Sequence, residues 1–115
     1  MKIERKSLKA IKFDGLEIRD YTAELDGSSS MAEITVPAGA QHKLAWSKRS
    51  DKYYYVIEGR ISFTVDDLVA DFSAGDACII RQGVRFSYEN KTGVVARVLL
   101  VHTPSFVLAE EVFEE

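Results

Sequence analysis

Hydrophobic and polar residues alternate in short runs along most of this chain, and helical periodicity is almost absent. The runs are rich in β-branched and aromatic residues and end at Gly, Pro, Asp or Asn, which is typical of β-strands joined by turns. We expect strands at residues 8–13, 16–25, 31–36, 53–57, 61–65, 68–72, 77–80, 85–89 and 94–101. So many short strands do not form one flat open sheet. The pattern therefore predicts an all-β fold, either a barrel or a jelly roll.

Composition and charge narrow the class of protein. The chain of 115 residues, 46% of them hydrophobic, is long enough for one domain, residues 1–115, with its own core. Its net charge of −3, with an acidic C-terminal tail at residues 107–115, disfavours nucleic acid, which binds clustered cations. We find no apolar run of signal-peptide or membrane-spanning length, and the single cysteine forms no internal disulfide. We therefore expect a soluble, cytoplasmic protein with no nucleic-acid or membrane partner.

Two sets of residues with fixed spacing run through the central strands. The first set begins and ends with glycine: Gly39, Ala45, Ser47, Lys52 and Gly59. The second set follows the next turn: Gly75, Arg81, Gly83, Phe86 and Asn90. In spacing and order, these residues resemble the two motifs of the cupin family, and the resemblance covers about residues 11–106. It implies a small single-domain, RmlC-like cupin, which is a jelly-roll barrel also described as a double-stranded β-helix. The barrel motifs lie within residues 31–106.

The resemblance fails at the metal-binding positions of the family. A typical cupin binds a divalent metal inside the barrel through two His, one Glu and a third His. By resemblance, the corresponding positions here are Ala45, Ser47, Lys52 and Phe86. Two of these side chains have no donor atom, Ser is a poor ligand for transition metals, and the Lys52 ammonium repels a cation. We therefore expect neither a metal nor another cofactor.

Strand alternation indicates what surrounds the inside of the barrel. If Lys52 keeps the inward direction of the family's Glu, then Tyr54 shares its face, whereas Tyr53 and Tyr55 point the other way. We predict that a small molecule binds near the following residues: Lys52, Tyr54, Trp46, Arg81, Phe86, Tyr88 and His102. The competing interpretation is that Lys52 extends into solvent and Phe86 fills the barrel.

The charged residues of this set allow several kinds of chemistry. A lysine among aromatic rings suits a carboxylate or phosphate, and a desolvated lysine with a lowered pKa acts as a base or nucleophile. We expect Arg81 and Arg85 at the rim of the barrel. There they either form an anion gate with Lys52, or are simply exposed, or pair with Glu58 or Asp76.

Three functions remain open at this point. The first is a non-metal cupin that binds a small polar or anionic molecule, such as a sugar derivative or a carboxylate. The second is a metal-independent enzyme similar to the isomerases and epimerases of the family, with Tyr54 and Lys52 as acid and base. The third is a structural cupin with a filled barrel that dimerises through Tyr53 and Tyr55. By resemblance we expect a homodimer, whereas the sequence assigns no catalytic residue.

Overall fold

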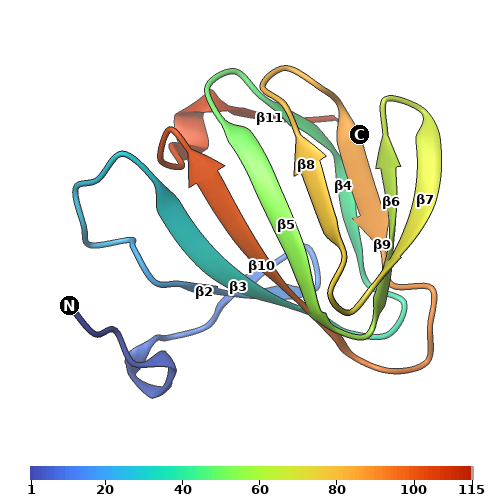
Figure 1. The fold of residues 1–115 in the computed structure, drawn as a ribbon, viewed down its shortest axis with the longest axis horizontal. Coiled ribbons are helices and arrows are strands. Elements are labelled where there is room, and N and C mark those ends of the chain that lie inside the picture. The colour runs from blue at the N-terminus through green and yellow to red at the C-terminus, as the bar shows by residue number, and fades with distance from the viewer. Residues whose placement is uncertain (115) are drawn as a thin grey trace.

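A computed structural model describes residues 1–114, and the regular structure in this range is almost entirely β-strand (Figure 1). The strands are β1 (Ile11–Phe13), β2 (Leu16–Asp20), β3 (Ser30–Val36), β4 (Gln41–Ser47), β5 (Asp51–Glu58), β6 (Arg60–Val65), β7 (Leu68–Ser73), β8 (Ala77–Ile80), β9 (Phe86–Glu89), β10 (Ala96–Thr103) and β11 (Glu111–Phe113). Two short 3-10 turns, η1 (Arg5–Ser7) and η2 (Leu108–Glu110), complete the described elements. No helix within residues 1–114 is long and apolar enough to span a bilayer.

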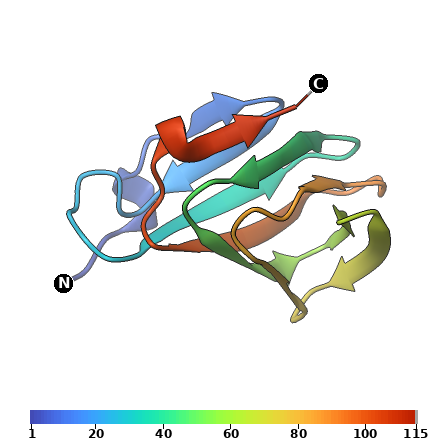
Figure 2. The same cartoon turned by 90° about the horizontal axis from the view of Figure 1, so that it is seen from above.

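The strands form two antiparallel sheets that face each other, which confirms the predicted all-β jelly roll. One sheet has the order β1-β2-β3-β10-β5-β8, and the other has the order β11-β4-β9-β6-β7. Figure 2 shows the N-terminal hairpin β1–β2 and the C-terminal strand β11 at the same edge of the molecule, and the rings of Phe13 and Phe113 are 5.3 Å apart. Both ends of the chain therefore help to build the same end of the barrel.

The core lies between the two sheets, and the alternation of β5 fixes which residues reach it. Tyr54 and Val56 are 2% and 0% exposed, whereas Tyr53 and Tyr55 are 36% and 47% exposed. Lys52 is 4% exposed and shares the face of Tyr54, as the alternation predicts, and this face points inward, as the resemblance to the cupin motif implies. A buried ammonium needs a group that compensates its charge, and the sequence pattern does not reveal which residue provides it.

Two motif residues show why the motif spacing produces this fold. Gly59 has a φ of +81°, and a Cβ added there would lie 2.7 Å from the Cβ of Ala96. Only glycine fits such a left-handed conformation at this close approach. Asn90 is fully buried, and its side-chain amide donates to the carbonyls of Val36 and Val94 at 3.0 and 2.7 Å. Its side-chain oxygen accepts from the Thr92 amide, so Asn90 starts the turn that precedes β10.

The structure differs from the sequence prediction in three segments. Strand β4 lies in a polar stretch whose alternation is too weak to detect. Strand β11 lies within residues 107–115, expected to be an acidic tail, and it pairs with β4 along Ser47, Trp46 and Ala45. The strand expected at 16–25 ends at Asp20, because the Asp20 carboxylate accepts from the Thr22 amide and starts a turn.

Candidate ligand-binding cavity

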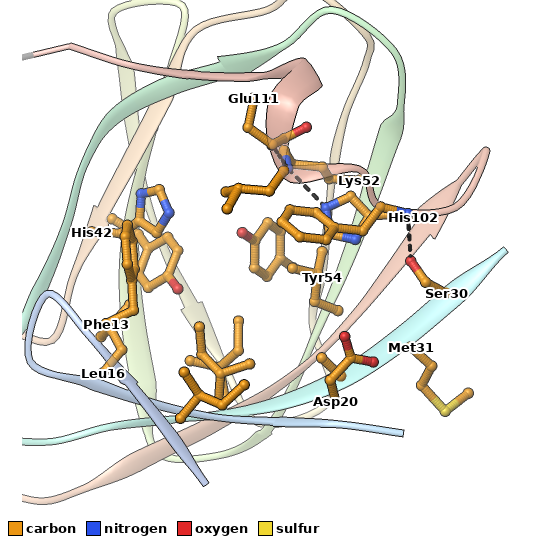
Figure 3. A pocket seen from close by; sticks show the side chains of 18 of the residues that line it. Phe13, Leu16, Asp20, Ser30, Met31, His42, Lys52, Tyr54, His102 and Glu111 are labelled. Carbon is orange, nitrogen blue, oxygen red and sulfur yellow. Dashed lines mark hydrogen bonds and ion pairs between the residues drawn. The ribbon is translucent and has the colours of Figure 1, made fainter. Parts of the chain in front are cut away.

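A cavity of about 280 Å³ lies between the two sheets, next to the N-terminal hairpin and β11 (Figure 3). Most of its lining is apolar, and a few polar side chains interrupt it. The lining residues are Ile11, Phe13, Leu16, Ile18, Asp20, Ser30, Met31, Ala32, Ile34, His42, Lys52, Tyr54, Tyr88, Leu100, His102, Phe106, Leu108, Glu111 and Phe113. A mostly apolar hollow with a few converging polar groups is the usual form of a small-molecule site, and such sites measure roughly 300–1,000 Å³.

Lys52 is held inside the barrel by two partners from opposite sheets. Its Nζ lies 2.5 Å from Oε1 of Glu111 and 2.9 Å from Nε2 of His102. The side chains of Lys52 and Glu111 are only 5% and 3% exposed, so this is a buried ion pair. Because an ammonium only donates, we assign Nε2 of His102 as the acceptor, which places the proton of a neutral His102 on Nδ1.

The electrostatics of this cluster follow from burial. Desolvation lowers the pKa of Lys52, while the charge of Glu111 and the hydrogen bond to it oppose this shift. Desolvation, and then the charge of Lys52, lower the pKa of His102 to about 3. At neutral pH, His102 is therefore uncharged, and the ammonium of Lys52 is compensated by the Glu111 carboxylate.

His42 presents a second nitrogen base to the cavity from β4. Its Nδ1 lies 2.7 Å from the Lys43 carbonyl, to which it donates, so Nε2 carries the free lone pair. Nε2 has no hydrogen-bond partner among residues 1–114. The ring stacks on Phe86 and Tyr88 with centroids 5.2 and 5.1 Å apart. Burial is the main cause that lowers the pKa of His42, which favours the neutral form.

Two tyrosines, Tyr54 and Tyr88, bring buried phenols to the cavity from β5 and β9. Their rings meet edge to face with centroids 5.5 Å apart. Burial raises the pKa of both phenols, so both remain protonated at neutral pH. Within residues 1–114, Oε2 of Glu111 is buried without a hydrogen-bond partner, and the buried Oη of Tyr88 makes no well-formed hydrogen bond and interacts only with the neighbouring Tyr54 phenol. Each such atom costs about 1–3 kcal/mol, so both favour a bound molecule that satisfies them.

The structure brings together four of the residues predicted to form the site. Lys52, Tyr54, Tyr88 and His102 all line the cavity. Phe86 lies beside it, because its ring is 5.5 Å from Nζ of Lys52 and it is 1% exposed, but it belongs to the core wall and not to the lining.

The other two predicted residues lie elsewhere. Trp46 is on the outer side of β4, between the buried Ala45 and Ser47, with the guanidinium of Arg85 5.9 Å from its ring. Arg81 is exposed and donates to Asp51 and to the Tyr53 hydroxyl at 3.3 and 3.2 Å. Neither arginine forms a gate with Lys52, and each has a different carboxylate partner from those expected: Arg81 pairs with Asp51 and Arg85 with Glu114.

Glu111 and His42 are the site residues that the sequence interpretation did not assign. Glu111 was counted with the acidic tail, although the apolar pair Val112–Phe113 beside it is a signal that this segment packs against the barrel. His42 had no defined direction, because β4 departs from regular pairing with β9 between His42 and Ala45. Such a bulge changes which way nearby side chains point, so simple alternation does not predict the facing of His42.

The donor set at the family's metal positions does not fit a divalent metal. Ala45 and Phe86 are both 1% exposed and apolar, and Lys52 is a cation. The Ser47 hydroxyl accepts from the Arg49 and Ser50 amides and so belongs to a turn. Among the described residues 1–114, no group of three or more His, Cys, Asp or Glu is placed to hold a metal ion. The polar groups among the described lining residues are instead a lysine, a glutamate, an aspartate, a serine, two histidines and two phenols.

Two facing antiparallel sheets with a cavity between them define the class of jelly-roll barrels. The chain belongs to the cupin family, because the model of the cupin domain matches residues 32–102. A relative in Methanocaldococcus jannaschii, the uncharacterized protein MJ1618, is 27% identical over 115 residues, which cover 87% of this chain and 91% of that protein.

Solved structures with the same fold include enzymes of different chemistry. The nucleoside dehydratase Pac13 superposes with a TM-score of 0.87 at 19% identity, over 100% of this chain and 91% of that chain. Three further structures of the Streptomyces protein contain uridine, each with a histidine or one of two tyrosines replaced. A predicted oxalate decarboxylase from Thermotoga maritima gives a TM-score of 0.83 at 18% identity, over 90% of this chain and 99% of that chain.

Proposed function

We propose that this cupin binds a small, uncharged polar molecule of sugar or nucleoside type in the cavity, without a metal. The observation that carries the proposal is a pair of buried polar oxygens, Oη of Tyr88 and Oε2 of Glu111, which belong to two residues that line the cavity. A ligand with several hydroxyl or N–H groups supplies the missing donors, and the apolar walls hold its less polar faces.

The charge of the site favours a neutral ligand over the anionic alternative. The only lysine on the described lining, Lys52, already has its charge compensated by Glu111. Of the other polar groups on the lining, the Asp20 carboxylate, Oε2 of Glu111 and Nε2 of His42 are acceptors, whereas Ser30, Tyr54 and Tyr88 bring only neutral hydroxyls. A carboxylate or phosphate would meet these acceptors without a free cation to balance it, and its desolvation would go uncompensated.

The comparison with the uridine complexes supports a nucleoside as the first ligand to test. The Streptomyces protein was studied with uridine after replacement of a histidine and of two tyrosines. This cavity also contains a histidine and two tyrosines, His42, Tyr54 and Tyr88. The two replaced tyrosines of that protein lie the same number of positions apart as Tyr54 and Tyr88 do here.

A metal-independent enzyme is the second candidate, and the geometry of His42 favours it. The backbone carbonyl of Lys43 fixes the tautomer, and the lowered pKa keeps Nε2 unprotonated at neutral pH. A neutral imidazole with its lone pair on a ligand cavity is suited to general-base catalysis. The filled-barrel alternative is less favoured, because the space beside Lys52 is a cavity.

Calorimetric titration with uridine tests the proposal. We expect binding by the wild-type protein, about tenfold weaker binding by Tyr88→Phe, which removes one hydrogen-bonding hydroxyl, and unchanged binding by Glu114→Gln. Glu114 is a matched control, because it comes from the same C-terminal segment but pairs with Arg85 at the surface. Binding that Tyr88→Phe leaves unchanged would place the ligand outside this cavity.

A further inference from the structure

The amine of Lys52 is presented to the cavity in a way that a surface lysine is not. Two of its three N–H bonds are directed to Glu111 and His102, at 2.5 and 2.9 Å. No other residue within 1–114 accepts a hydrogen bond from it, and the Phe86 ring covers it from 5.5 Å. The nitrogen is therefore held in place beside a space that admits a small molecule (Figure 3).

We propose that Lys52 is a nucleophilic amine that forms a reversible imine with the carbonyl group of a small aldehyde or ketone in the cavity. The inference rests on the proposed function for the position of the ligand, and it adds the chemical class of the group that reacts. An amine nucleophile needs a desolvated site with a neighbouring proton acceptor, and here Glu111 is that acceptor.

The step balances with the groups that are present. The Lys52 ammonium gives one proton to Oε1 of Glu111, and the freed lone pair attacks the carbonyl carbon. The new C–N bond replaces the carbonyl π bond, and the oxygen takes the proton back from Glu111 to give a carbinolamine. The nitrogen still carries two protons at this stage. Loss of the hydroxyl group together with one of them releases one water and leaves a protonated imine, whose positive charge the Glu111 carboxylate compensates. His102 keeps the nitrogen oriented through the 2.9 Å contact and takes no proton, because its pKa is lowered to about 3.

Burial makes this reaction faster at Lys52 than at an ordinary lysine. Desolvation lowers the pKa of Lys52 in spite of the opposing effect of Glu111. Each unit by which the pKa falls increases the fraction of free amine at neutral pH about tenfold. Lys6 and Lys12 provide the comparison within the same chain, because their side chains are 86% and 76% exposed.

Reductive labelling of the intact wild-type chain tests the inference. Glycolaldehyde traps an amine as an imine, cyanoborohydride reduces that imine by hydride transfer, and peptide mass spectrometry then measures the rate at each lysine. We expect Lys52 to be labelled about tenfold faster than Lys6 and Lys12 at pH 7. As the pH is raised, the labelling rate of Lys52 should level off at a lower pH than the rates of Lys6 and Lys12. Labelling of Lys52 at the rate of Lys12 or below would overturn the inference and leave Lys52 as an ion-pair partner only.

Uridine separates this inference from the proposed function. If both hold, saturating uridine slows the labelling of Lys52 and leaves the labelling of Lys12 unchanged. Uridine binding without fast labelling of Lys52 refutes the imine and retains the binding site. Fast labelling without uridine binding retains the reactive amine and refutes the nucleoside as ligand.

Discussion

Replacement of Glu111 by glutamine tests whether the buried ion pair with Lys52 holds the C-terminal strand against the barrel. Glutamine keeps the size of the side chain and an oxygen acceptor for Nζ but removes the negative charge. Removal of one partner from a buried pair costs roughly 3–5 kcal/mol, because an uncompensated charge stays inside. Both side chains are at most 5% exposed, so solvent screening is small. We expect Glu111→Gln to lower the free energy of unfolding by about 3 kcal/mol.

Urea unfolding followed by the fluorescence of the single tryptophan, Trp46, measures this loss as a shift of the midpoint at constant slope. The matched control is Glu114→Gln, whose pair with Arg85 has side chains 57% and 34% exposed and is worth below about 1 kcal/mol. A double variant, Lys52→Met with Glu111→Leu, removes both charges and should recover most of the loss. If Glu111→Gln costs no more than Glu114→Gln, the ion pair does not contribute in the way that its burial implies.

Four further predictions concern pH, backbone conformation, assembly and the cysteine. Because the pKa of His102 is lowered to about 3 in the folded chain, the unfolded chain binds more protons between about pH 3 and 6.5. The free energy of unfolding should therefore fall as the pH drops below 6.5. In urea unfolding measured at several pH values, His102→Gln should make this fall smaller. An unchanged fall would refute the role of His102. Gly59→Ala should lower the free energy of unfolding by about 2 kcal/mol or more, since its φ is +81° and a Cβ there meets β10. Gly93→Ala, where a Cβ meets open space, should change thermal stability little, and equal effects of the two substitutions would contradict the role of Gly59. We also propose a homodimer through the exposed aromatic face of β5, so sedimentation should give a dimer that Tyr55→Lys, at a residue 47% exposed, shifts to monomer; a monomeric wild type at high concentration would count against it. Burial raises the pKa of Cys78 to about 11, so its alkylation at pH 8 should be far slower than that of a free thiol. Fast alkylation would show that strand β8 opens.

The fold was predictable because two local signals agree. Alternation gave the inward face of β5, and the motif glycines marked the turns, as the left-handed φ of Gly59 shows. Strands β4 and β11 were not predictable by the same route, since a three-residue strand with one inward glutamate has no periodicity to detect. Short strands of this kind are stabilised by long-range pairing, which a local pattern does not contain.

The candidate site was predictable only in part. Lys52, Tyr54 and Tyr88 follow from strand alternation combined with the inward direction that the cupin resemblance implies for Lys52. Predicting the position of Glu111 requires knowing that β11 pairs with β4. Predicting the direction of His42 requires knowing the bulge between β4 and β9, which changes where its side chain points. The sequence leaves a polar or an anionic ligand open, because it does not show that Glu111 compensates the charge of Lys52. Ligand binding itself stays a prediction.

The most direct test of the account is thermal unfolding of chelator-treated protein in the presence of uridine, uridine monophosphate or a divalent metal. A ligand at about a hundredfold excess over its dissociation constant adds roughly 2.7 kcal/mol of stability. We predict that uridine raises the unfolding temperature, that the phosphate group weakens this effect, and that the metal alone has none. Stabilisation by the metal alone, or by the monophosphate more than by uridine, would contradict a neutral, metal-independent site.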